Sequence, residues 1–448
     1  MSDRRLIFLD ALRGFFILYV VWLHATIGVV FNNDPQALNT LPKWLLIVFA
    51  PVMILATWAP IFVVISGAAN AYVLHNVMKR HQEKQGTGVP FRSFMAGSLV
   101  TGIFLYSLSI FNMTFMHHSM NYNGSFQHTL FTGSLHEGSW QSFSPDLLFY
   151  NDALSLVAIS GILINLLLYV LWSGNGFNRM QRTVKWIAAV AAGVLLTSPI
   201  VHSILSPVFF NALNNSHYGM AFALKLFIGP NLSVIPFLSY GLVGALIGIG
   251  LARRVPASLF RRYGYGVAAF MVVAGAGLFM VQEFSPTQIA LHPQPLKIHL
   301  VNLGLMLACC TFLVLHMEYC SEEKRARVAL RTLWFRRVGL MALTLFCLES
   351  LFAVLFSNGY LWTLGIEGPF PRSPWVIIPY VVCILVFWNL VLKAWEKTDF
   401  KYGVEWWMSW LVCIVRNRPT VRLQADEVLH KPCTPITPDI SKPQPVLK

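Results

Sequence analysis

The sequence predicts an all-α fold, a polytopic membrane bundle of about ten transmembrane helices with both termini in the cytoplasm. Of the 448 residues, 56% are hydrophobic and only 12% are charged, about half the charged fraction of an average soluble domain. The apolar residues form runs long enough to cross a bilayer, and Lys and Arg cluster between alternate runs. A soluble fold of this length has too little interior to bury so much apolar surface.

The N-terminal apolar run is expected to be a retained first span. It is too long for a signal-peptide core and contains Asp10 and Arg13. A membrane-spanning helix needs roughly 20 mainly apolar residues. Applied to the whole chain, this requirement predicts spans near residues 6–30, 45–75, 93–112, 150–172, 186–205, 232–251, 264–282, 298–317, 338–357 and 375–394.

The second run, 45–75, is too long for one straight helix. Pro51 and Pro60 are expected to break it and to leave a true span at 58–74. Counting the run once places the N-terminus and the later basic loops on one side, the cytoplasmic side by the positive-inside rule. Counting it twice would put those basic loops outside. The net charge of +14 is therefore a topology signal, and no nucleic-acid partner is expected.

The chain is expected to have three parts. Residues 1–400 form the transmembrane domain, and the short loops and compact chain favour a bacterial inner membrane, with a eukaryotic organelle as the alternative. Residues 401–417 hold an aromatic-rich apolar run followed by arginines, which is typical of an amphipathic helix in the membrane interface. Residues 418–448 are rich in proline and are expected to be a disordered cytoplasmic tail.

Neither the cysteines nor the outer histidines predict a metal or disulfide site. All seven cysteines lie in the last third of the chain, outside the predicted outer loops, and no pair has zinc-site spacing. The largest outer connection, 113–149, carries four histidines, but their spacing is irregular, so an exposed polar loop is expected and no metal. These histidines are His117, His118, His128 and His136.

Three ionisable residues lie in the first predicted span: Asp10, Arg13 and His24. Ionisable residues are costly inside a membrane and are therefore functional candidates. At 100° per residue all three face one side, with Arg13 and His24 about 16 Å apart along the axis. Arg13 would hold an anion, oriented by Asp10, and His24 would accept a proton or carry a group. A structural role, with an Asp–Arg salt bridge and a packed histidine, stays open.

Two N-terminal segments carry a resemblance to a known family. The run Asp10-Ala-Leu-Arg13-Gly14 and the spacing from Arg13 to His24 resemble the opening of the acyltransferase-3 family. Residues 62–67, Phe-Val-Val-Ile-Ser-Gly, resemble its Phe-Phe-Val-Leu-Ser-Gly motif. The family's Arg-x-x-Arg motif is missing from the next inner loop, which offers Lys79, Arg80 and Arg92 instead.

Two later segments resemble related membrane proteins. Residues 339–346 are similar to a Gly-Arg-Met-Ala-Leu-Thr-Asn-Tyr segment of YeiB-like proteins, and residues 402–406 to their closing Gly-Pro-Leu-Glu-Trp. Heparan-α-glucosaminide N-acetyltransferase belongs to the same transmembrane acyltransferase superfamily. Glu349 follows in the ninth predicted span, near mid-membrane, where a lone carboxylate is expensive. It is expected to be an acid supporting catalysis or the partner of an arginine.

The resemblance implies transfer of an acyl group, often acetyl, from cytoplasmic acyl-CoA to a glycan or small-molecule acceptor at the outer face. His24 would be the general base or a transient acyl carrier. The catalytic set expected is His24, Asp10, Arg13 and Glu349. The residues expected at the acyl-CoA are Arg13, Lys79, Arg80, Arg92 and Ser66, because basic groups suit its phosphates and Ser66-Gly67 lets a neighbouring helix approach closely.

Two other functions stay open. A transporter or flippase for a lipid-linked or sugar-containing molecule would use Asp10, Arg13, His24 and Glu349 as a relay, although the chain lacks an inverted repeat and matched broken helices. A membrane anchor or sensor is less favoured, because no soluble domain of appreciable size is evident. The acceptor, the acyl chain length and the oligomeric state do not follow from the sequence.

Overall fold

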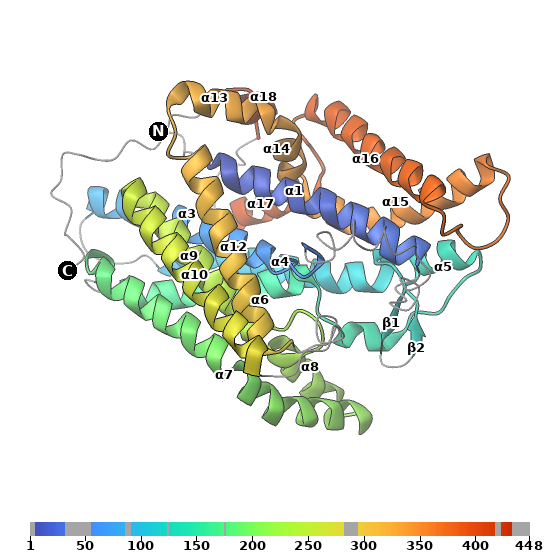
Figure 1. Ribbon diagram of the computed structural model, residues 1–448, viewed down its shortest axis with the longest axis horizontal. Coiled ribbons are helices and arrows are strands. Elements are labelled where there is room, and N and C mark those ends of the chain that lie inside the picture. Colours follow the sequence, from blue (N-terminus) through green and yellow to red (C-terminus); the bar gives the residue numbers. More distant parts are fainter. Residues whose placement is uncertain are drawn as a thin grey trace.

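The computed structural model is a helical bundle whose helices run mostly along one direction (Figure 1). It describes residues 5–31, 55–85, 91–122, 125–173, 176–281, 294–416 and 423–431. Within these residues, ten helices are long and apolar enough to cross a membrane. Each matches one predicted span, so the prediction of an all-α polytopic membrane protein is confirmed.

The ten spans are formed by α1 and its continuation η1 (Ile7–Leu23, His24–Val30), α3 (Ile61–Gln85), α4 and its continuation η3 (Phe91–Phe111, Asn112–Met116), α6 (Ala153–Trp172), α7 (Met180–Asn214), α9 (Val234–Ala252), α10 (Ala257–Val281), α12 (Leu296–Met317), α15 (Ala342–Thr363) and α16 (Pro374–Glu396). The shorter helices are α5 (Phe131–Glu137), α8 (Tyr218–Ile228), α13 (Glu322–Arg331), α14 (Leu333–Leu340), α17 (Val404–Val415) and α18 (Ala425–Leu429). Strands β1 (Met120–Tyr122) and β2 (Ser125–Gln127) form an antiparallel hairpin, and η4 (Pro145–Phe149) and η5 (Gly176–Asn178) are 3-10 turns.

The prolines shape two of these spans. Helix α3 begins at Ile61, directly after Pro60, as the break predicted there requires. Pro51 lies outside the described residues. Helix α7 runs well past its predicted bounds because it continues through Pro199 and Pro207.

Small residues bring α3 and α9 into close contact. A Cβ atom on Gly67 would overlap the carbonyl oxygen of Gly241, and one on Gly244 would overlap that of Val64. Only glycine allows the two backbones to approach this closely. The expectation that Ser66-Gly67 admits a neighbouring helix is therefore confirmed.

Helix α1 packs against α14 and α15, which follow one another with a break at Met341. A Cβ on Gly339 would overlap the carbonyl oxygen of Asp10, and one on Gly14 would lie 2.8 Å from the Gly339 nitrogen. Figure 1 shows α13, α14 and α18 near the start of α1, and α5 and the β-hairpin near its far end. We call the end at the start of α1, where Asp10 and Arg13 lie, the basic end. The far end, where His24 begins η1, is the histidine end.

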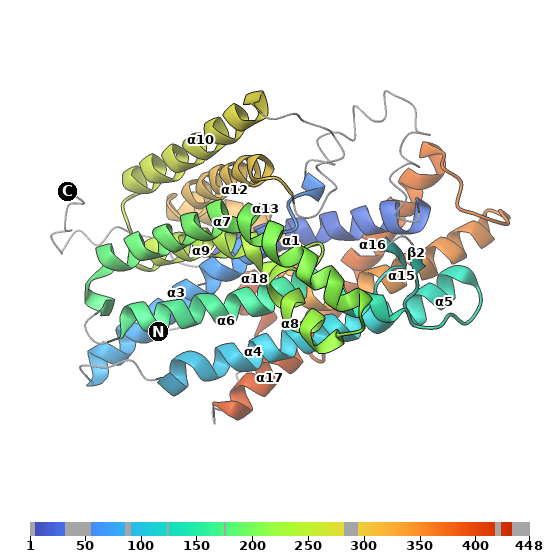
Figure 2. The ribbon, with the colours of Figure 1, turned by 90° about the horizontal axis from the view of Figure 1, so that it is seen from below.

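The C-terminal part differs in one respect from its prediction. Helix α17, inside the predicted interfacial segment, lies against α4 at the edge of the bundle with no fully buried residue (Figure 2). Within the expected disordered tail, however, residues 423–431 are folded, and α18 buries Ala425 and Leu429. Residues 417–422 and 432–448 lie outside the described residues.

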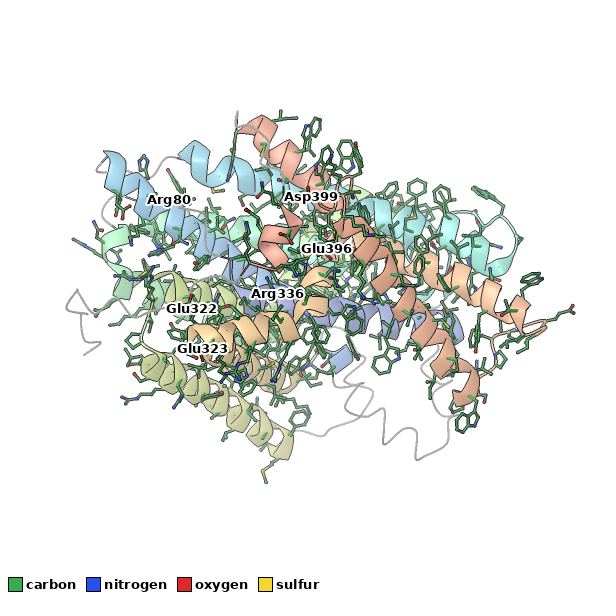
Figure 3. All side chains as sticks on the ribbon, turned by 90° about the horizontal axis from the view of Figure 1, so that it is seen from above. Arg80, Glu322, Glu323, Arg336, Glu396 and Asp399 are labelled. Atoms are coloured by element: carbon green, nitrogen blue, oxygen red, sulfur yellow. The ribbon has the colours of Figure 1, made fainter. Side chains whose placement is uncertain are left out.

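Polar contacts from α14 and from the turn after α16 hold this short helix. The Arg336 guanidinium donates to the carbonyl oxygens of Val428 (2.5 Å) and Leu429 (2.9 Å), and the Ala425 nitrogen donates to Asp399. Figure 3 shows Arg336, Glu396 and Asp399 in the same region of the molecule. Proline content predicted disorder for this tail, but it carries no information about a buried arginine elsewhere in the chain. The folded segment could therefore not be predicted from composition.

Candidate active site

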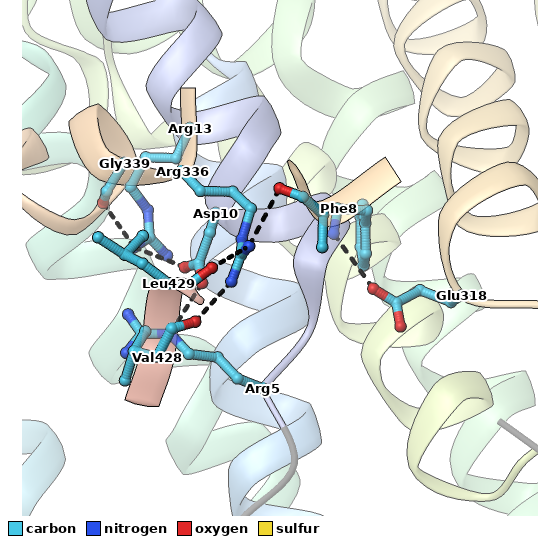
Figure 4. Close-up of polar contacts among 10 residues, drawn as sticks. Arg5, Phe8, Asp10, Arg13, Glu318, Arg336, Gly339, Val428 and Leu429 are labelled. Atoms are coloured by element: carbon cyan, nitrogen blue, oxygen red, sulfur yellow. Dashed lines mark hydrogen bonds and ion pairs between the residues drawn. The ribbon is translucent and has the colours of Figure 1, made fainter. Parts of the chain in front are cut away.

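At the basic end, α1 presents an arginine–aspartate group to α14 (Figure 4). Asp10 is buried and accepts a 2.7 Å hydrogen bond from Nε of Arg5. Arg13 lies 3.9 Å from the other carboxylate oxygen and donates to the Gly339 carbonyl at 3.3 Å. The predicted Asp10–Arg13 pair therefore exists, but Asp10 has its shorter contact with Arg5. Arg13 keeps 29% of its side-chain surface exposed, which leaves guanidinium donors for an anion.

At the histidine end, His24 and Glu349 connect the first span to the ninth. Nδ1 of His24 lies 2.6 Å from Oε1 of Glu349. The His24 side chain is 22% exposed, whereas that of Glu349 is 1% exposed. Glu349 therefore contacts a histidine and not an arginine, which corrects the second of its two predicted roles. The arrangement orients one ring nitrogen toward a buried carboxylate and leaves Nε2 for a reactant.

Two histidines that the sequence placed in an exposed loop complete this end. His117 and His118 are 7% and 8% exposed, so the expectation of a polar exposed loop is wrong at these positions. The ring centroid of His118 lies 4.6 Å from that of His24, and the His117 centroid lies 5.9 Å away. We call His24, His117, His118 and Glu349 the histidine cluster.

Local backbone geometry brings these rings together. His24 is the first residue of the π-helical turn η1, and His117 directly follows the π-helical turn η3. The wide i→i+5 bonding is seen where the His117 nitrogen donates to the Asn112 carbonyl at 2.8 Å. Gly28 lets the ring of His118 sit against η1, since a Cβ there would lie 3.3 Å from its Cγ. Single π-helical turns interrupt the regular spacing of side chains and are frequent at functional sites.

Ser350 connects the two halves of the cluster. Its hydroxyl donates to Oε1 of Glu349 at 2.6 Å, and its oxygen lies 3.4 Å from Nδ1 of His118. Because the Ser350 hydroxyl donates its hydrogen to Glu349, its oxygen can accept a hydrogen bond from Nδ1–H of His118. Nε2 of His118 then keeps its lone pair. His24 and His118 are thus both linked to one carboxylate. The other oxygen of that carboxylate, Oε2, is buried and has no hydrogen-bond partner among the described residues.

Burial favours the neutral form of His117 and of His118. Burial lowers the pKa of His118 well below 6.5, and the neighbouring charges of His117 and His24 lower it further. Burial, and then the charge of His24, also lowers the pKa of His117. A neutral imidazole has one nitrogen lone pair, which can accept a proton or bind a metal ion.

The other predicted acyl-CoA residues lie elsewhere. Lys79 and Arg80 are exposed near the end of α3, and Nε of Arg80 donates to the Asn76 carbonyl at 3.3 Å. Ser66 is half-buried within α3, and its oxygen accepts from Asn70 of the same helix. Arg92 belongs to α4, and its side chain lies outside the described residues. Among the residues expected at the acyl-CoA whose side chains the structure describes, Arg13 is the one that contacts the α14–α15 unit.

Three buried arginines at the basic end were counted in the sequence only as topology signals. They are Arg325, Arg336 and Arg337. Arg325 pairs with Glu318 at 2.6 Å, and Arg337 pairs with Glu396 at 2.5 Å. Arg336 donates instead to the backbone carbonyls of Val428 and Leu429. Because a buried charge is costly without a partner, these contacts give the three arginines a structural role in connecting helices. Comparisons of this chain with protein-family models, curated proteins and solved structures gave no match.

Proposed function

We propose that this protein is a membrane acyltransferase that moves an acyl group, commonly acetyl, from cytoplasmic acyl-CoA to a glycan or small-molecule acceptor at the opposite face. The contact of 2.6 Å between His24 and Glu349 carries the proposal. A histidine whose Nδ1–H donates to a buried carboxylate has its Nε2 lone pair free, and the carboxylate stabilises the imidazolium once a proton is taken. Such a pair supplies the general base that acyl transfer to a hydroxyl or amine can use.

The reaction follows from that pairing. Nε2 of His24 removes a proton from the acceptor, whose oxygen or nitrogen attacks the thioester carbonyl carbon. The carbon–sulfur bond breaks, and the CoA thiolate leaves and takes up the proton from His24. Glu349 accepts from Nδ1–H of His24 and so holds the ring in one tautomer. Ser350 donates to Glu349 at 2.6 Å and so fixes the orientation of the carboxylate.

The distance between the two ends of α1 suits this donor. Arg13 and His24 are separated by about 16 Å along the helix. In acyl-CoA the phosphates are separated from the thioester by a long uncharged arm, so phosphates at Arg13 would place the thioester deeper in the bundle. Guanidinium groups bind phosphate through paired donors. On this proposal the basic end faces the cytoplasm and the membrane is a bacterial inner membrane.

Acetyl-CoA binding and slow hydrolysis by the purified protein in detergent test the proposal. We expect Arg13→Ala to weaken binding about ten- to a hundredfold, because hydrogen bonds to charged groups contribute about 1.5–3 kcal/mol. We expect His24→Ala to bind acetyl-CoA but to consume it far more slowly. Arg261→Ala, which removes an exposed arginine of α10, is the matched control and should behave as wild type. A folded wild type that neither binds nor consumes any acyl-CoA would refute the proposal, and the same polar residues would then be tested as a transport pathway.

A further inference from the structure

We infer that His24, His118 and Glu349 form a binding site for one divalent transition-metal ion, with Zn²⁺ as the favoured ion. This inference goes beyond the proposed acyl transfer and does not depend on it. The three residues come from three distant segments: the start of η1, the loop after η3, and α15. One potential ligand atom of each lies within 4.8 Å of those of the other two.

The geometry is close to that of a zinc site. Zinc binds imidazole nitrogen and carboxylate oxygen at about 2.0–2.2 Å, so two ligand atoms of a tetrahedral ion are about 3.4 Å apart. The contact between Nδ1 of His24 and Oε1 of Glu349, 2.6 Å, is shorter than this, and the outer limit of 4.8 Å is longer. The ligand spacing of a zinc site therefore falls between these two values, and side-chain rotation would be needed to place all three ligands around one ion. Three protein ligands leave a fourth position open.

The surroundings of the cluster point to a ligand as well. His118 and Glu349 are buried, and Oε2 of Glu349 has no hydrogen-bond partner among the described residues. A buried carboxylate oxygen without a partner is expensive, and a cation would satisfy it. Ser350 contacts both Glu349 and His118, at 2.6 and 3.4 Å. Such outer contacts orient metal-binding carboxylates and imidazoles in known sites.

The donor set selects the kind of ion. Mg²⁺ and Ca²⁺ prefer six or more oxygen ligands, which two imidazoles and one carboxylate do not supply. No thiolate belongs to the cluster, so a soft ion such as Cu(I) is not favoured. Imidazole with carboxylate suits Zn²⁺, and two histidines with one glutamate form a known zinc set.

Metal binding and acyl transfer would exclude one another at this site. Whichever ring nitrogen of His24 binds the ion, the other nitrogen carries the ring proton. The ring then has no lone pair with which to remove a proton from an acceptor. Zn²⁺ is therefore expected to be a reversible inhibitor of the proposed reaction, and a chelator should restore turnover.

The test is metal binding by the full-length purified protein, stripped with a chelator and titrated with Zn²⁺ in the absence of acyl-CoA. We expect one tightly bound ion per chain by elemental analysis. Ser350→Ala should weaken binding roughly 10–100-fold, as is typical for an outer contact, and His118→Ala and Glu349→Gln should weaken it more. His136→Ala is the matched control. His136 lies in α5, outside the cluster, and its ring contacts the neighbouring carboxylate of Glu137. This variant should bind as wild type does.

A wild type that binds no ion, or variants that all bind like wild type, would overturn the inference. Should a variant fail to fold, Co²⁺ added to the wild type decides. A four-coordinate site gives intense visible absorption, whereas weak absorption typical of hydrated Co²⁺ would contradict the site. Because the metal titration contains no acyl-CoA, its outcome does not depend on whether the protein is an acyltransferase. A protein that consumes acetyl-CoA but binds no Zn²⁺ would reject the metal site alone.

Discussion

His24 and Glu349 meet at 2.6 Å, and they are equally far along the chain from Gly14 and Gly339, which also meet. Helix α1 and the α14–α15 unit therefore run side by side in the same direction. The glycine contact at the basic end sets the register in which the histidine meets the carboxylate.

Gly339→Ala should therefore disturb both stability and activity. The added Cβ would overlap the carbonyl oxygen of Asp10, and such overpacking typically costs about 1–3 kcal/mol. We expect a lower melting temperature in detergent and slower acetyl-CoA consumption. Gly193→Ala is the control, because a Cβ there meets nothing within 4 Å, and it should be neutral or stabilising by up to about 1 kcal/mol. Equal melting temperatures for wild type and Gly339→Ala would show that the close contact is not required.

Ser350→Ala should slow acyl transfer without unfolding the protein. The variant loses the hydroxyl that donates to Glu349 at 2.6 Å, and a hydrogen bond to a charged group contributes about 1.5–3 kcal/mol. We expect acetyl-CoA turnover to fall about 10- to 100-fold at unchanged binding. Ser357→Ala, on the same helix, removes a hydroxyl that donates to the Val354 carbonyl and should leave turnover unchanged. Unaltered turnover in Ser350→Ala would argue against an oriented carboxylate.

Glu405→Gln should destabilise the start of α15. The Glu405 carboxylate accepts from the Leu343 nitrogen and the Thr344 hydroxyl, both at 2.6 Å, and so caps the helix after its break at Met341. Loss of these charge-assisted bonds should lower the free energy of unfolding by about 1–3 kcal/mol. Thermal unfolding in detergent measures it, with Glu137→Gln on α5 as the control. If both variants melt with the wild type, the cap contributes nothing.

Lys225 should make the protein more stable at alkaline pH. Burial lowers the pKa of this α8 residue from 10.5 to about 8, although the charge of Asp152 opposes the shift. The unfolded chain therefore binds the proton more tightly than the folded protein does, so stability rises with pH between about 8 and 10.5. We expect the melting temperature of the wild type, measured relative to that of Lys225→Met, to rise as the pH increases across this range. A constant difference between the two proteins would contradict the lowered pKa.

The spans could be predicted because hydropathy is a local property, and each of the ten predicted runs overlaps a spanning helix. The shared face of Arg13 and His24 also follows from helical periodicity alone, and both contact the α14–α15 unit. The identity of the partner does not follow from it. Glu349 was a candidate by its mid-span position, but an arginine and a histidine were equally compatible with that position.

The positions of His117 and His118 depend on local backbone geometry that the periodicity of the sequence does not predict. His117 and His118 follow a π-helical turn and fold inward, so their polar sequence context suggested exposure where the structure buries them. Two adjacent histidines directly after a span were the available signal. The partners of the buried arginines could not be predicted either, because a charge cluster indicates topology whether or not a side chain such as Arg325 has a partner like Glu318.

The most direct test of the account is a double-mutant cycle on acetyl-CoA consumption, with wild type, His24→Ala, Glu349→Gln and the double variant. If the two residues act as one unit, each single change should lower turnover about 10²–10⁴-fold, and the double variant should be no slower than the slower single variant. Independent, multiplying losses, or a single variant with the wild-type rate, would contradict the central claim that His24 and Glu349 form the reacting pair.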